Sequence, residues 1–100
     1  MHARLTTVSV QPDRVAEMTQ IYQNTIMLVI NSQPGLKAAY LLVDPSTGKG
    51  QSLTNWDSEA DGLAYERSGT YQAQVDKVRG FFAGPPSPKT YEVAAQSTRG

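Results

Sequence analysis

The chain has 100 residues, which is enough for one domain with a modest core, and its nine basic and nine acidic side chains cancel. Because those charges are scattered, cysteine is absent and His2 is the only histidine, the composition argues against nucleic-acid binding, disulfides, thiolate catalysis and a cysteine or histidine metal site. No apolar leader opens the chain, and its longest apolar run, Ile26 to Ile30, is too short to span a bilayer, so we expect no membrane contact and a cytoplasmic location.

The first predicted element is a strand from Ala3 to Val10, because this segment is rich in β-branched residues and ends before a proline. Alternation along it places every second side chain on one face: Thr6, Val8 and Val10. The opposite face carries Leu5, Thr7 and Ser9.

A helix is predicted to begin at Pro12 and Asp13, since proline suits a first helical turn and a carboxylate is favoured near free amides. Apolar residues at spacings of three and four carry it to Ile30: Val15, Met18, Ile21, Tyr22, Thr25, Ile26 and Val29. Its last turns, residues 26–30, are apolar all round. This end is therefore either buried by more than its own sheet or, as the alternative, a strand.

The segment from Pro34 to Trp56 predicts a β-hairpin, with strands Leu36 to Asp44 and Lys49 to Trp56 joined by a turn at residues 45–48. Alternation gives the first strand two apolar faces, with Leu36, Ala38, Tyr40 and Leu42 on one and Ala39, Leu41 and Val43 on the other. Both faces need cover, and two helical segments fit naturally on one side. The other face is expected to pack against a second copy.

Asp57 or Ser58 can cap a second helical segment, which Gly69 divides into helices over about 58–68 and 70–82. The proline-rich residues 84–88 end it. Thr90 to Ser97 is predicted to be the fourth strand, and residues 98–100 a loose tail of a single domain spanning 1–100.

The order strand, helix, strand, strand, helix, strand predicts an α+β ferredoxin-like βαββαβ sandwich. Right-handed crossovers place strands 1 and 3 in the centre of a four-stranded antiparallel sheet, with the helices on one face. The bare face is then expected to form an isologous contact in a C2 homodimer.

The run PGLKAAYLLVDPSTGKGQSLTNWDSEADGLA, followed by a proline-containing loop and TYEVAA, resembles the antibiotic biosynthesis monooxygenase domain family. The resemblance implies a dimeric α/β barrel, in which two sheets face each other and each subunit has a small cavity between sheet and helices. Characterised relatives include cofactor-independent oxygenases that act on polycyclic phenols and quinols, and haem-degrading enzymes.

Trp56 matches a tryptophan that lines the pocket in several members of that family. The haem-degrading branch has a histidine ten positions later, where this chain has Glu66, and an asparagine on the first strand, where it has Thr6 and Thr7. The resemblance therefore disfavours haem degradation, and we expect no cofactor and no metal.

The cofactor-independent branch has an asparagine four residues before the tryptophan and a tyrosine six residues after it. This chain has Ser52 and Gly62 there, with Asn55 and Tyr65 as nearby residues of the same types. The active site of that branch is thus not reproduced position for position.

Trp56 offers a flat surface for stacking on a planar ligand, and Tyr65 offers a phenol that can orient a ligand oxygen or serve as an acid. These two are the candidate catalytic residues. The candidate substrate-binding residues are Tyr22, Tyr40, Leu63 and Phe82. The alternative is structural: the tryptophan covers the sheet edge, the tyrosines bond backbone carbonyls, and His2 and Glu66 are solvated.

Two functions from different classes follow. The first is a cofactor-independent monooxygenase acting on a small electron-rich aromatic such as a phenol, quinol or anthrone, where the substrate supplies the electrons and the protein deprotonates it and holds it dry. The second is a non-catalytic homodimeric module that binds a small molecule or has a structural role.

Overall fold

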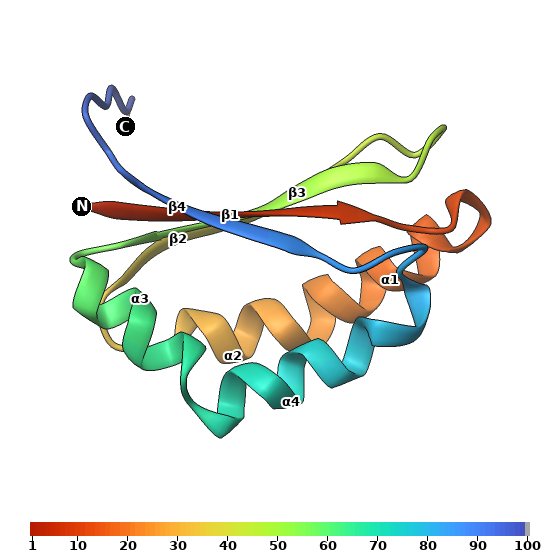
Figure 1. Cartoon of the computed structure of the whole chain (residues 1–100), viewed down its shortest axis with the longest axis horizontal. Coiled ribbons are helices and arrows are strands. Elements are labelled where there is room, and N and C mark those ends of the chain that lie inside the picture. The colour runs from red at the N-terminus through yellow and green to blue at the C-terminus, as the bar shows by residue number, and fades with distance from the viewer. Residues whose placement is uncertain (100) are drawn as a thin grey trace.

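The computed structural model describes residues 1–99 and shows an antiparallel sheet with helices layered against one of its faces (Figure 1). The four strands are β1 (His2–Ser9), β2 (Leu36–Val43), β3 (Lys49–Trp56) and β4 (Ser87–Glu92), in the spatial order β2-β3-β1-β4. The predicted α+β ferredoxin-like fold, with strands 1 and 3 in the centre, is confirmed.

The first helical segment is continuous from Pro12 to Asn31 but changes its winding. It consists of a 3₁₀ turn η1 (Pro12–Arg14), α1 (Val15–Ile21), a π-helical turn η2 (Tyr22–Ile26) and α2 (Met27–Asn31). The helical stripe that predicted this segment is confirmed, and the alternative of a strand over residues 26–30 is wrong.

The second helical segment divides where expected, between α3 (Glu59–Glu66) and α4 (Gly69–Val78), and ends in a 3₁₀ turn η3 (Arg79–Phe81). Each helix has a serine N-cap, because the Ser58 hydroxyl accepts from the Asp61 amide at 3.2 Å and the Ser68 hydroxyl accepts from the Tyr71 amide at 3.2 Å. No helix in residues 1–99 is long and apolar enough to cross a membrane.

The fourth strand lies earlier than predicted. It spans Ser87–Glu92 rather than 90–97, because β1 pairs it from Thr7 opposite Ser87 back to His2 opposite Glu92 and then ends. Beyond that point the Val93 amide donates to the Met1 carbonyl at 3.0 Å. Pro88 is tolerated because β4 is an edge strand. Of the predicted tail, residues 98 and 99 have no regular structure and residue 100 lies outside the described residues.

A β-bulge corrects one predicted face of β2. Leu36 pairs with Trp56 but Ala38 pairs with Asn55, so one extra residue lies between these pairs on β2. Leu36 therefore turns to the helix side and packs against the buried cluster around Trp56, not with Ala38 on the outer face as alternation alone predicted.

The buried side chains between sheet and helices form two clusters at opposite ends of the central strands. The larger lies at the end of β1 and contains Val8, Val10, Val15, Met18, Ile26, Val78 and Phe81. The smaller lies at the end of β3 and contains Ile30, Trp56 and Tyr65. Most of the tertiary hydrophobic stabilisation of the chain comes from these clusters.

No described helix covers the other face of the sheet (Figure 1). Three large side chains on this face are about half exposed, Tyr40 at 52%, Leu42 at 50% and Tyr91 at 51%. A second copy covering this face stays a prediction.

Candidate functional site

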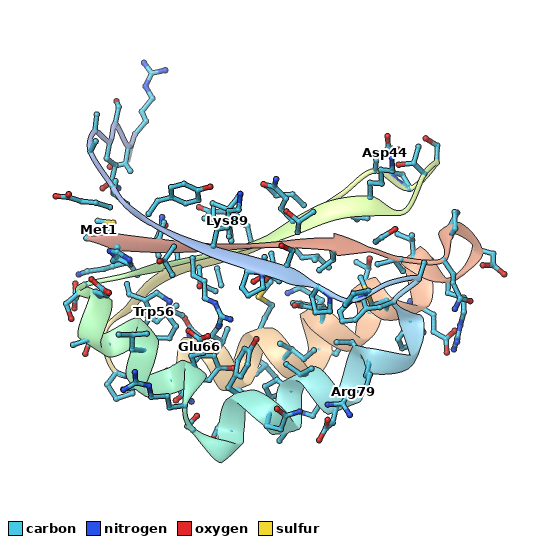
Figure 2. All side chains as sticks on the ribbon, in the orientation of Figure 1. Met1, Asp44, Trp56, Glu66, Arg79 and Lys89 are labelled. Atoms are coloured by element: carbon cyan, nitrogen blue, oxygen red, sulfur yellow. The ribbon has the colours of Figure 1, made fainter. Side chains whose placement is uncertain are left out.

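A cavity of about 80 Å³ lies between the sheet and the helices. Its wall is mostly apolar and is built from β1, β2, β3, the π turn, α2, α3, α4 and the chain after α4. The residues with polar groups that line it include Arg4, Thr6, Tyr22, Tyr40, Ser52, Thr54, Tyr65, Tyr71 and Gln74. Figure 2 shows Trp56 and Glu66 between the sheet and the helices, whereas Lys89 lies on the opposite side of the sheet.

Three aromatic rings form one wall of this cavity. The rings of Trp56 and Tyr65 have centroids 5.4 Å apart and are tilted by 32°, and the ring of Tyr71 meets that of Tyr65 edge-on at 5.5 Å. Trp56 is 2% exposed, and its indole N–H donates to the Thr54 hydroxyl at 3.0 Å. The indole therefore offers a ligand its face rather than its donor.

Gly62 explains how α3 comes so close to this wall. A Cβ at residue 62 would lie 3.2 Å from Cδ1 of the Trp56 indole, so a larger residue would push the helix away. Gly62 and Tyr65 both line the cavity, since residues three apart share a helix face. Tyr65 therefore presents its phenol from the same helix face as Gly62.

The π turn shapes the opposite wall. The Met27 amide donates to the Tyr22 carbonyl five residues back, and the Thr25 hydroxyl donates to the Ile21 carbonyl at 2.6 Å. The wider turn lets Tyr22, Ile26 and Met27 all line the cavity. Such π turns occur frequently at functional sites.

Two tyrosines of the cavity, Tyr22 and Tyr65, are neutral hydrogen-bond donors near neutral pH. Burial raises the pKa of the Tyr22 phenol, an effect that the Ser52 hydroxyl partly offsets. Burial, reinforced by the neighbouring phenols, raises the pKa of Tyr65 to about 12 although Arg4 opposes the shift. Neither phenol can therefore act as a base at physiological pH.

Arg4 is the one charged residue among the described residues that line the cavity. Its Nη2 donates to Glu66 Oε1 at 3.0 Å, and its Cζ lies 5.0 Å from the centroid of the Tyr71 ring. The expectation that Glu66 is solvated is therefore wrong, because only 33% of its side chain is exposed and it is paired. His2 differs from expectation too, since its Nε2 is buried with no partner in residues 1–99.

The sequence-predicted site residues divide into two groups. Trp56, Tyr65, Tyr22 and Phe82 line the cavity together. Tyr40 alternates with the core-packed Ala39 and Leu41, which turns its half-exposed side chain to the outer face although the residue contributes to the cavity wall. Leu63 is not among the described residues that line the cavity.

Sequence reasoning missed Arg4 and Gln74. The alternation that placed Thr6 and Val8 on one face of the first strand extends back to Arg4. The sequence therefore allowed the prediction that Arg4 shares their face. No pattern in the sequence predicted that Gln74 is buried, because the charged and amide side chains around it on α4 are exposed.

The family model for antibiotic biosynthesis monooxygenase matches residues 1–77. The chain belongs to the antibiotic biosynthesis monooxygenase family. No match was found among curated proteins.

Solved structures with the same fold include several proposed antibiotic biosynthesis monooxygenases. The protein from Nitrosomonas europaea is 18% identical with a TM-score of 0.77, over 95% of this chain and 100% of that one. The Caulobacter crescentus protein is also 18% identical with a TM-score of 0.79, over 94% and 90%. The Deinococcus radiodurans protein is 16% identical with a TM-score of 0.79, over the full length of both chains. At these identities the likeness extends to the fold alone.

The residues of this family member do not fit haem. Glu66, at the position of the histidine in the haem-degrading branch, is held by Arg4, and the cavity volume of about 80 Å³ is far below that of a porphyrin. Within residues 1–99, no group of three or more histidine, aspartate or glutamate residues could hold a metal ion.

Proposed function

We propose that the protein is a cofactor-independent monooxygenase that oxidises a small phenol or quinol. The observation that carries this proposal is the aromatic wall of Trp56, Tyr65 and Tyr71 beside a cavity of about 80 Å³ that also receives hydroxyl donors. Family membership over residues 1–77 supports it.

The size of the cavity favours one ring over the three of an anthrone. An engineered cavity of about 150 Å³ binds benzene, and the cavity here is about half that volume. A single ring enters with modest side-chain adjustment, for which the unbranched Met27 in the wall is suited. A tricyclic substrate would require the helices to separate from the sheet.

In this reaction the substrate supplies the electrons. A phenolate adds dioxygen at a ring carbon, forming a C–O bond. After protonation to the hydroperoxide, the O–O bond breaks as the C–H proton leaves, giving a quinone and water. A phenol and one O₂ thus yield one quinone and one H₂O, with one oxygen atom entering the product.

Each predicted site residue has a role in this proposal except Leu63 and Tyr40. Trp56 stacks on the ring through its indole face, because its N–H is bonded to Thr54. Tyr65 donates a hydrogen bond to a ligand oxygen, since its raised pKa keeps the phenol protonated. Tyr22 and Phe82 close the apolar wall and exclude water.

We also propose that two copies form a C2 dimer through their bare sheet faces. The outer face carries large half-exposed side chains that the chain's own helices leave uncovered in the described structure. Burial of apolar area at roughly 25 cal/mol per Å² favours covering such a face.

A binding module without catalysis is the second candidate function. It is favoured by the absence of a carboxylate or imidazole from the described cavity lining, so that no protein base reaches the ligand directly. If the protein only binds, aromatic ligands will occupy the cavity without consuming oxygen.

Oxygen uptake with a panel of single-ring phenols and quinols separates these two candidates. The monooxygenase predicts uptake with one atom of labelled O₂ in the product, reduced by Trp56→Ala and Tyr65→Phe in variants that still fold. Tyr91→Phe is the matched control, since Tyr91 lies on the outer face and does not line the cavity within residues 1–99. Saturable binding with no uptake above the protein-free rate would assign the protein to the binding class.

A further inference from the structure

Arg4 is a buried cation that the protein satisfies only in part. Its side chain is 11% exposed, Nη2 has Glu66 as its acceptor, and Nε is buried without any acceptor in residues 1–99. A guanidinium carries five N–H donors and cannot release its proton. The wall of the cavity therefore holds a permanent positive charge with spare donor capacity.

The groups around Arg4 include one carboxylate and otherwise neutral side chains, so a negatively charged ligand would not meet strong repulsion there. Tyr71 of α4 lies under the guanidinium, and Tyr65 of α3 interacts with it as a neutral phenol. Tyr22, also a neutral phenol, lines the same cavity from the π turn. Glu66 of α3 is the carboxylate that balances the guanidinium. That carboxylate is one-third exposed, so it can turn toward water when a ligand oxygen takes its place on the guanidinium.

We propose that Arg4 forms an anion-binding subsite of the cavity, and that the ligand is a single-ring phenol held as its phenolate with the oxygen on the guanidinium. This inference rests on the proposed function, because it assigns the ionisation state of the same substrate. The ligand oxygen displaces Glu66 and supplies the acceptor that the guanidinium lacks.

The subsite also explains how a bound phenol can lose its proton although no base lines the described cavity wall. A cation within hydrogen-bonding reach lowers the pKa of an acid by about 1 to 3 units. Arg4 thereby favours the electron-rich phenolate, so that water or the displaced Glu66 carboxylate takes the proton. The phenolate is the form that can give electrons to dioxygen.

The probe for this subsite is 4-nitrophenol, whose absorbance distinguishes phenol from phenolate without any turnover. Bound to the protein across a pH series, it should ionise with an apparent pKa lower by about 1 unit or more than in buffer. Arg4→Gln should remove that shift and weaken phenolate binding about 10- to 100-fold, the loss expected for a hydrogen bond to a charged group. Glu66→Gln should tighten phenolate binding severalfold, because it removes the competing carboxylate.

Arg14→Gln is the matched control. Arg14 also pairs with a carboxylate, Glu17 at 3.4 Å, and also lies over an aromatic ring, Phe81 at 4.2 Å, but it is not among the described residues lining the cavity. It should bind the probe as the unaltered protein does.

Binding of 4-nitrophenol in its neutral form, or equal phenolate affinity in a folded Arg4→Gln, would overturn the subsite. Should Arg4→Gln fail to fold, Glu66→Gln decides, and unchanged or weaker phenolate binding in it would overturn the subsite as well. Oxygen uptake is a separate measurement. Uptake that does not depend on Arg4 rejects the subsite and keeps the monooxygenase, whereas phenolate binding without uptake supports the subsite and rejects the monooxygenase.

Discussion

Gly62 of α3 lies directly against the indole of Trp56, with the position of a Cβ on residue 62 only 3.2 Å from Cδ1 and 3.4 Å from Cγ. Trp56 is 2% exposed and bonded to Thr54, so it has little room to move away. This contact sets the height of α3 above the sheet. It thereby places Tyr65, one turn further on, at the cavity.

Gly62→Ala should lower stability even though alanine favours a helix. The helical gain is about 1 kcal/mol, while forcing a methyl group into a packed contact costs about 1 to 3 kcal/mol. We expect a net loss of about 1 kcal/mol, which is a fall of about 4 to 8 °C in Tm for a chain of this size. Thermal unfolding followed by circular dichroism measures it.

Gly69→Ala is the matched control for that substitution. Nothing lies within 4 Å of a Cβ at Gly69, which starts α4, so alanine there should stabilise by about 0.4 to 1 kcal/mol. Equal effects of the two substitutions would show that the indole contact does not limit residue 62.

Ser68→Ala should destabilise the junction that holds two cavity tyrosines. The Ser68 hydroxyl accepts from the Tyr71 amide at 3.2 Å and donates to the Tyr65 carbonyl at 2.6 Å. Loss of a serine N-cap costs about 1 kcal/mol. Ser46→Ala, in an exposed turn, should change the unfolding free energy by less than about 0.5 kcal/mol. Denaturant titration of both variants tests the difference.

Local patterns predicted most of this fold because most of its elements are locally determined. The helical spacing from Val15 to Val29, the β-rich hairpin and the division of the second helical segment each follow from neighbouring residues. The ends of the last strand were predicted wrongly, because they depend on its pairing with β1 and not on its own residues. The bulge that turns Leu36 inward is likewise a property of pairing with β3.

The candidate site was predictable where a side chain belongs to a strand with a clear buried face or to an apolar helical stripe. Tyr22 meets that condition and lines the cavity. Trp56 and Tyr65 line it too, but they were predicted from the chemistry of their side chains and from the family resemblance rather than from such a pattern. The direction of the Tyr40 side chain was not predictable, because both faces of its strand are apolar and alternation does not show which face packs against the helices. The pairing of Arg4 with Glu66 joins residues far apart in the sequence, and no local pattern announces it.

The unfolding free energy should fall as pH rises from about 10 to about 12. The pKa of Tyr65 is raised to about 12 in the folded protein, so between the unfolded and folded values the folded state binds more protons. That contribution is fully present below pH 10 and is lost as pH passes 12. Tyr65→Phe should remove about 1 to 2 kcal/mol of this decline. Denaturant titrations at several alkaline pH values compare the slopes, and identical slopes would contradict the burial of this phenol.

The proposed dimer predicts that Leu42→Asp yields single subunits. Leu42 is half exposed on the outer sheet face, where a buried unpaired carboxylate would oppose association. Leu28→Asp is the matched control, because Leu28 is 69% exposed on α2, on the helical side. Sedimentation at micromolar concentration should show dimers for the unaltered protein and for Leu28→Asp. A single-subunit mass for the unaltered protein would reject the dimer.

Trp56 is the only tryptophan of the chain and forms a wall of the cavity, so its fluorescence reports on this site alone. Titration of the protein with a single-ring quinol should change that fluorescence saturably, and a tricyclic anthrone should not. Gly62→Ala, which disturbs the indole contact, should weaken the quinol response. A flat titration with every single-ring phenol and quinol would contradict the claim that this cavity is a binding site for a small aromatic.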